Sequence, residues 1–193
     1  MSLIDFVARY SPIAVMILIA AVSYYLLLGI YAKHCKPGSA LAKVLKYLFL
    51  FILGGSIYYS IEILWRGHSH FSMFIVGGLC FVIMGLANEI FSWDLYFEYQ
   101  LLIGWCAVLI LEFVSGCIVN LWLGWGVWDY SGMPFNLLGQ ICLTYAFLWI
   151  PIVILGILID DWVRYKLLNE EKPRYRSLIV DSIKYLINKI KNK

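Results

Sequence analysis

The chain has 193 residues, of which 63% are hydrophobic and only 14% are charged, whereas soluble domains are about 45–50% apolar and about 25% charged. This composition excludes a water-soluble globular domain, a disordered chain and a small secreted module held by disulfides. With a net charge of only +3, the sequence predicts an integral membrane protein built as one bundle.

Five stretches of the chain are long and apolar enough to form membrane-spanning helices, which take roughly 20 residues each. In chain order they are residues 10–32, 44–65, 71–93 and 101–123, followed by a fifth span within 130–159 that starts near Leu137. We therefore predict an all-α integral membrane protein in which residues 1–165 form a single domain, a bundle of five transmembrane helices.

The basic residues are concentrated in two parts of the chain. Four lie between Lys33 and Lys46 and nine between Arg164 and Lys193, and five spans bring all of these to the same side of the membrane. Because loops rich in Lys and Arg stay in the cytoplasm, the N-terminus is expected outside and the C-terminus in the cytoplasm, in the plasma membrane. Basic clusters that flank apolar runs favour the lipid bilayer as a partner rather than nucleic acid.

Residues 166–193 are predicted to form a basic cytoplasmic tail. After Pro173, apolar residues recur at helical spacing between Ile179 and Ile190, and lysines occupy positions between them. This pattern is typical of an amphipathic helix that lies on the inner membrane surface. A frayed basic tail is the alternative.

Two glycine pairs, Gly54-Gly55 and Gly77-Gly78, occupy comparable places in the second and third spans. Small residues let membrane helices approach closely. We expect these pairs to serve helix packing rather than substrate binding.

Polar residues fall into two layers in this topology. The second and fourth spans both run outward, so the polar residues at their ends and at the start of the fifth span gather at the outer face, with Glu112 deeper. The candidate substrate-binding residues are Glu62, Arg66, His68, His70, Glu112, Asn120, Trp128, Asp129, Tyr130, Asn136 and Gln140. The smaller layer at the inner face comprises Asn88, Glu89, Asp160, Asp161 and Arg164.

Ordinary structural roles also account for several of the outer residues. Glu62 and Arg66 have the i, i+4 spacing of a helix ion pair, and Trp and Tyr commonly line the membrane interface. His68 and His70 offer two nitrogen ligands for a metal, with Glu62 or Asp129 adding oxygen. An HxH pair alone is weak evidence, however, and we predict no metal or other cofactor.

Glu112 lies near the middle of the fourth span, where an ionised side chain costs about 2.5–3.5 kcal/mol on insertion scales. It must therefore be protonated, paired or exposed to a wet cavity. Arg66, His68 and His70 are its nearest candidate partners by depth. We favour a functional role for Glu112 over a packing role.

The segment from Trp128 to Asn136 has the composition of a structured loop, because Gly132 tolerates positive φ and Pro134 stops a helix. Non-helical backbone at this depth must be buried in protein or line a cavity. We expect the loop either to cap an outward-open pocket between the second, fourth and fifth spans or to close the bundle as a rigid turn.

Three strings of the sequence, residues 54–81, residues 111–143 and the closing DDWVRY, resemble the membrane-protein family catalogued as Putative ABC-transporter type IV. The resemblance covers residues 50–165. Its signature positions in this chain are Glu62, Arg66, Gly67, His68, His70, Ser72, Met73, Glu112, Gly116, Asn120, Trp128, Asp129, Tyr130, Ser131, Pro134, Asn136, Gly139 and Gln140. The resemblance implies a permease. Because the chain has no GxxxxGK[ST] motif, an ATP-driven transporter would need a separate ATPase subunit.

Three functions follow from these observations. The first is a permease-like transport component with an outward-facing polar pocket, which would act as a homodimer or with a partner. The second is a membrane-embedded enzyme that acts on a lipid or isoprenoid at the outer leaflet by acid–base chemistry. Its candidate catalytic residues are Glu62, His68, His70, Glu112 and Asp129, although GxSxG and HExxH motifs are absent. The third is a structural or regulatory partner of other membrane proteins.

Overall fold

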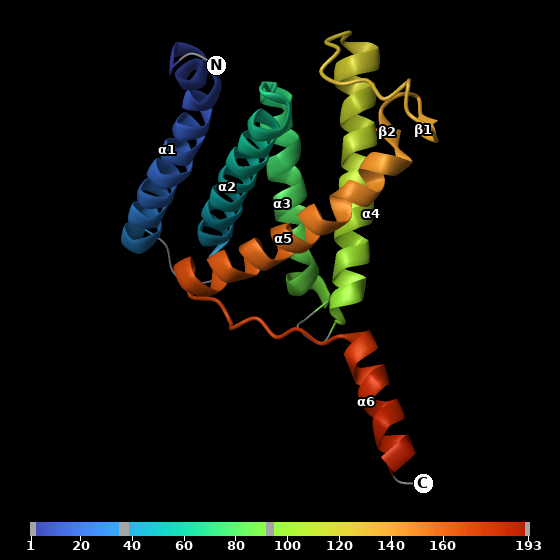
Figure 1. The fold of residues 1–193 in the computed structure, drawn as a ribbon. Helices are drawn as coiled ribbons and strands as arrows, with labels where there is room; N and C mark the ends of the chain where they lie inside the picture. The colour runs from blue at the N-terminus through green and yellow to red at the C-terminus, as the bar shows by residue number, and fades with distance from the viewer. Residues whose placement is uncertain (1–2, 35–38, 92–94, 192–193) are drawn as a thin grey trace.

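The computed structural model describes residues 3–34, 39–91 and 95–191. Figure 1 shows how the helices and strands are arranged. The elements are α1 (Leu3–His34), α2 (Ala40–Arg66), α3 (Phe71–Phe91), α4 (Phe97–Gly116), the π-helical turn η1 (Cys117–Trp122), β1 (Asn136–Leu137), β2 (Ile141–Cys142), α5 (Leu143–Leu167) and α6 (Leu178–Lys191).

Among the described residues, five helices are long and apolar enough to cross a membrane: α1, α2, α3, α4 together with η1, and α5. This confirms the predicted all-α bundle of five spanning helices. Helices α1, α2 and α4 begin a few residues earlier than predicted, and α3 ends at Phe91. The predicted third span also includes residues 92 and 93, which lie outside the described residues.

The fifth membrane helix differs most from its prediction. It begins at Leu143 rather than near Leu137, because the residues before it form the antiparallel hairpin of β1 and β2. It also continues beyond residue 159, since Asp160 is buried in protein contacts instead of facing lipid. The uncharged stretch 130–159 is therefore partly loop, and the true helix is shifted toward the C-terminus.

Helices α2, α3 and α4 stand side by side, α5 crosses α3 and α4 obliquely, and α1 packs against α2 at the edge of the bundle (Figure 1). We call the end that carries residues 123–142 the loop end. We call the opposite end, which carries the start of α2 and residues 168–177, the tail end. The two termini lie at opposite ends, as an odd number of spans requires (Figure 1). Which end faces the cytoplasm stays a prediction.

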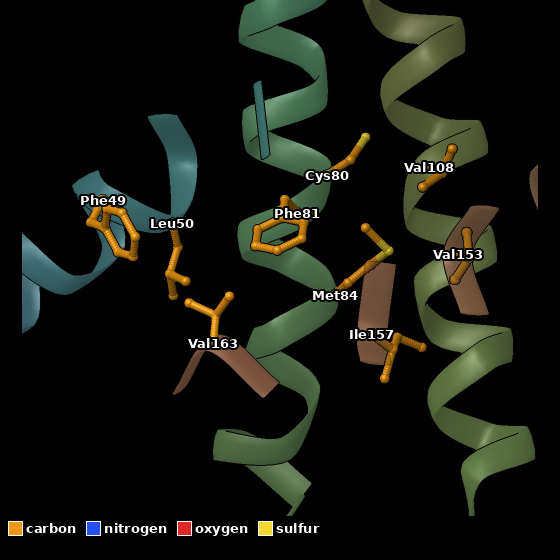
Figure 2. Packing of buried hydrophobic residues seen from close by; sticks show 9 residues of the cluster. All are labelled: Phe49, Leu50, Cys80, Phe81, Met84, Val108, Val153, Ile157 and Val163. Carbon is orange, nitrogen blue, oxygen red and sulfur yellow. The ribbon is translucent and has the colours of Figure 1, made fainter. Parts of the chain in front are cut away.

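The hydrophobic core lies where α2, α3, α4 and α5 converge (Figure 2). Its buried residues are Phe49, Leu50, Cys80, Phe81, Met84, Val108, Val153, Ile157 and Val163. Because all four helices contribute, the core fixes the rotation of each helix and therefore the faces that carry the polar residues described below.

The glycine pairs lie where α2 and α3 are in contact. A Cβ on Gly55 would come within 2.5 Å of the Phe74 carbonyl oxygen, and a Cβ on Gly78 within 2.6 Å of the Phe51 carbonyl oxygen. The two helices thus approach backbone to backbone, which only small residues permit. This confirms the predicted packing role of the glycines.

Replacing Gly78 by alanine is expected to lower the stability of the bundle, because the added methyl group meets the backbone of Phe51, which cannot move aside as a flexible side chain can. Overpacking of this kind costs about 1–3 kcal/mol, and the Tm of the detergent-purified protein measures it. Gly29→Ala is the matched control, since no atom lies within 4 Å of a Cβ added at Gly29 in α1. Equal melting temperatures for the two variants would contradict the close approach of α2 and α3.

Helix α6 extends beyond the bundle at the tail end (Figure 1). Its first turn is attached to the start of α4, where the Leu178 amide donates to Glu98 Oε2 at 3.0 Å and the Ser177 hydroxyl donates to Glu98 Oε1 at 2.5 Å. The tail therefore contains a helix anchored on the bundle. The placement of this helix on a membrane surface stays a prediction.

Candidate functional site

An ion pair between α2 side chains stands at the loop end. Arg66 Nη2 lies 2.9 Å from Glu62 Oε1, and the Ser69 hydroxyl donates to Glu62 Oε2 at 2.6 Å. Arg66 Nη1 also donates to the Val127 carbonyl oxygen at 3.1 Å. The i, i+4 ion pair expected from the sequence is present, and it connects α2 to the loop that follows η1.

The two outer histidines have different partners. His68 is exposed, with Nδ1 3.2 Å from the Arg66 carbonyl oxygen. His70 Nδ1 lies 2.9 Å from the Ser72 hydroxyl, and its ring packs against Trp125 at a centroid distance of 5.2 Å. No group of three or more His, Cys, Asp or Glu residues within the described ranges is arranged to hold a metal ion.

Hydrogen bonds of Asn120 and Gln140 hold the buried side of the loop. Asn120 Nδ2 donates to Gln140 Oε1 at 2.8 Å, and the Val127 amide donates to Asn120 Oδ1 at 2.7 Å. The buried indole of Trp128 donates to the Gln140 carbonyl oxygen at 2.9 Å. These bonds satisfy polar groups of non-helical backbone, as burial at the end of a membrane bundle requires.

The outer part of the loop is a set of tight turns. Asp129 Oδ1 accepts from the Ser131 hydroxyl at 2.5 Å and from the Ser131 amide at 2.8 Å, which holds the pKa of Asp129 below its ordinary value. Positive φ occurs at Phe135, Leu138 and Gly139, not at Gly132 as predicted. The Asn136 amide group donates to main-chain carbonyls of the same loop. Asp129 and Asn136 thus bond within the loop, and both are exposed.

Asn136 and Gln140 do not lie at the start of the fifth span, contrary to the prediction. Both belong to the hairpin segment that precedes α5. The sequence shows only that this stretch is uncharged. Its hydrogen bonds, which decide against a helix, involve Asn120 and other residues distant along the chain.

Glu112 is 4% exposed and lies on the face of α4 that points into the bundle. The Trp149 indole Nε1 donates to its Oε2 at 2.8 Å, and the Tyr130 hydroxyl donates to its Oε1 at 3.3 Å. Burial raises the pKa of Tyr130, so its hydroxyl remains a donor. The carboxyl group therefore joins α4 to α5 and to the loop.

The prediction that Arg66, His68 or His70 is the partner of Glu112 is wrong. Arg66 contacts Glu62 and Val127 instead, and the two histidines bond locally. Sequence reasoning missed Trp149, which lies inside an apolar helix. In the predicted fifth span, which starts near Leu137, Trp149 falls near the middle rather than in an interfacial belt, and this is the signal that could have identified it.

A cavity of about 120 Å³ lies among α2, α3, α4 and α5, and Glu112 is part of its lining. The rest of the wall is mostly apolar, with the Tyr58 and Trp149 rings stacked at a centroid distance of 5.4 Å. Of the predicted outer residues, Glu112 alone is among those lining this cavity. The cavity is smaller than the roughly 300–1,000 Å³ typical of ligand pockets.

A second polar cluster lies at the tail end and connects α2, α3 and α5. Glu89 accepts hydrogen bonds from Lys46 Nζ at 2.7 Å, from the Tyr47 hydroxyl at 2.5 Å, and from Arg164. Arg164 Nε also donates to Asp160 Oδ2 at 2.6 Å. We call these residues the tail-end cluster.

Residues after α5 complete the tail-end cluster. Glu170 lies 3.0 Å from Lys46 and 3.5 Å from Arg164, and the Tyr175 hydroxyl donates to Asp161 at 2.9 Å. The structure therefore brings together the predicted inner residues Glu89, Asp160 and Arg164. Their partners Lys46, Tyr47 and Glu170 were not predicted, nor was Tyr175, the partner of the predicted inner residue Asp161. The Asn88 side chain lies outside the described part of the structure.

Five apolar helices, four of which surround a buried carboxyl group, define a multi-pass α-helical membrane protein. The chain belongs to the family described as Putative ABC-transporter type IV, whose family model matches residues 10–187. This confirms the resemblance drawn from the sequence strings and makes the chain a transport-related membrane protein. Searches of the curated proteins and of the solved structures find no match to it.

Proposed function

We propose that the chain is the permease-like, membrane-spanning component of a transport system whose ATPase is a separate subunit. The observation that carries this proposal is the position of Glu112, a carboxyl group on the wall of a cavity among four membrane helices. Ionisable groups inside a membrane bundle commonly mark substrate or ion pathways. Membership of the transport family supports the same assignment.

In this proposal, the hydrogen bonds of Glu112 break and form again as α5 or the loop moves relative to α4. Its two donors belong to different elements, Trp149 to α5 and Tyr130 to the loop. If α5 or the loop moves away from α4, one of these bonds breaks and the carboxyl group faces the widened cavity. The small volume of the cavity, about 120 Å³, corresponds in this proposal to a closed form of the pathway.

The proposal includes an orientation and an assembly. The protein lies in the plasma membrane with its N-terminus outside and its C-terminus in the cytoplasm. The loop end is then the outer end. The ATPase then docks at the tail end, beside the basic tail. The proposal also includes a homodimer, for which the exposed apolar surface of α1 is one available contact face.

Native mass spectrometry of the tagged full-length protein, gently extracted from its own membranes, tests this function. We expect a stoichiometric second subunit whose peptides contain a P-loop, and ATP hydrolysis by the purified complex. A multisubunit membrane complex known to survive the same extraction serves as the control. A monomer or homodimer without an ATPase would contradict the proposal, and a bound phosphorylated isoprenoid in its place would favour the lipid-modifying enzyme.

A further inference from the structure

A larger cavity, of about 440 Å³, lies at the tail end, far from the predicted outer residues. It is formed by the second half of α1, the first turns of α2 and the residues that follow α5. Its volume falls within the roughly 300–1,000 Å³ range of ligand pockets. We call it the α1–α2 cleft.

The walls of the cleft change from apolar to polar along the helices. Its apolar wall is formed by Leu45 and Phe49 of α2, which are buried, and by Leu27 and Leu28 of α1, which are half-buried. Lys43, in the first turns of α2, lies nearer the helix ends. The cleft thus has an apolar interior and a polar mouth at the tail end.

The polar mouth carries an uncompensated positive charge. Lys46 is neutralised by Glu89 at 2.7 Å and Glu170 at 3.0 Å. Lys43, by contrast, has no side-chain hydrogen bond or ion pair with any residue that the structure describes. Within the same described ranges, Tyr31 and Asn169, which also line the cleft, make no side-chain hydrogen bond.

These features match an anionic amphiphile. A soluble anion would use Lys43 and leave the apolar wall unused, whereas a hydrocarbon would leave the lysine without a partner. Basic pockets between membrane helices bind lipid head groups, and each lysine near the surface attracts anionic lipids by roughly 1 kcal/mol. Because the apolar window of α1 contains no buried residue, this wall of the cleft adjoins the lipid phase.

We propose that the α1–α2 cleft binds one anionic phospholipid, with an acyl chain along Leu27, Leu28 and Phe49 and the phosphate at Lys43. Such a lipid joins α1 to α2. Glu170, which lines the same cleft, is paired with Lys46 and Arg164, so its negative charge is offset where the phosphate lies. The site is independent of Glu112 and of the proposed transport function.

Native mass spectrometry of the purified full-length protein tests the site with two defined probes, dioleoyl-phosphatidylglycerol and dioleoyl-phosphatidylcholine. The two lipids share the same acyl chains and differ in head-group charge. We expect the first to be retained more strongly, and Lys43→Gln to weaken its retention by about fivefold, the factor expected for one lysine. Equal retention of both lipids, or unchanged retention by Lys43→Gln, would overturn the proposal.

Two further variants and one soluble probe complete the test. Lys184→Gln removes a lysine from α6, outside the cleft, and is expected to retain the lipid as the unaltered protein does. If Lys184→Gln lost as much lipid as Lys43→Gln, the lipid would be held by general charge attraction and not by a site. Leu28→Trp fills the cleft and is expected to lower retention of both lipids, with Tm as the folding control. Glycerol phosphate is expected not to displace the phospholipid. Full displacement would show that the cleft binds the phosphate group alone and would overturn the lipid site.

Discussion

Replacing Arg164 by methionine is expected to destabilise the bundle strongly. Arg164 is 4% exposed and Asp160 is 0% exposed, so the variant leaves a buried carboxylate without its cation. Breaking a buried ion pair by removing one partner costs about 3–5 kcal/mol. Glu89 is only partly buried and keeps Lys46, so most of this cost comes from Asp160. The Tm and the yield of monodisperse protein in detergent measure it.

The chain offers a matched control for this substitution. Arg174 and Glu171 form an ion pair whose side chains are 72% and 71% exposed, and exposed pairs contribute about 0–1 kcal/mol. Arg174→Met is therefore expected to melt close to the unaltered protein. Adding Asp160→Asn to Arg164→Met should restore part of the lost stability, because no buried charge then remains without a partner. Similar melting of the two single variants would contradict a stabilising tail-end cluster.

Replacing Glu112 by glutamine is expected to abolish transport-coupled ATP hydrolysis while leaving the fold intact. A glutamine presents its carbonyl oxygen to the Trp149 indole and an amide hydrogen to the Tyr130 oxygen, so both contacts of the carboxyl group are rebuilt without its charge. The readouts are the Tm of the purified protein and the ATPase rate of the complex in lipid nanodiscs. We expect the rate to fall by roughly 100-fold or more, the range assigned to groups that transfer protons.

Two variants separate function from packing at this position. Glu112→Ala removes the acceptor of a buried indole, which costs about 1–3 kcal/mol, and should lower the Tm where Glu112→Gln does not. Asp5→Asn removes a carboxylate charge at an exposed position of α1, away from the proposed ATPase docking site, and should keep full activity. A fully active Glu112→Gln complex would assign Glu112 to packing alone, and a glutamine variant that melts like the alanine variant would contradict the rebuilt contacts.

The sequence was sufficient to predict those parts of the fold that depend on one helix at a time. Hydropathy and length identify five membrane helices, and the glycine pairs identify the surfaces where α2 and α3 meet. The i, i+4 spacing of Glu62 and Arg66 likewise identifies an ion pair within α2. Each of these features is encoded by residues close together in the chain.

Contacts between distant segments were harder to predict. Topology gives the depth of a residue in the membrane but not the direction in which its side chain points. Depth alone therefore made Arg66 an expected partner of Glu112. The actual partner, Trp149, reaches Glu112 because α5 crosses the bundle obliquely (Figure 1). In the same way, an uncharged stretch gave no indication that Gln140 bonds to Asn120 and delays the start of α5.

The position of both members of the Asp160–Arg164 pair on one helix has a consequence for how the protein enters the membrane during synthesis. A single charge costs about 2.5–3.5 kcal/mol at the centre of an inserting helix, whereas partners one helical turn apart enter together with their charges balanced. Lys46 and Glu89, on α2 and α3, are paired once α3 has been made. When α5 arrives, its contact with Glu89 joins two ion pairs that are each already neutral, so neither pair enters as an isolated charge. The other buried carboxyl group of α5, Asp161, receives its hydrogen bond from Tyr175 once the residues after α5 have been made.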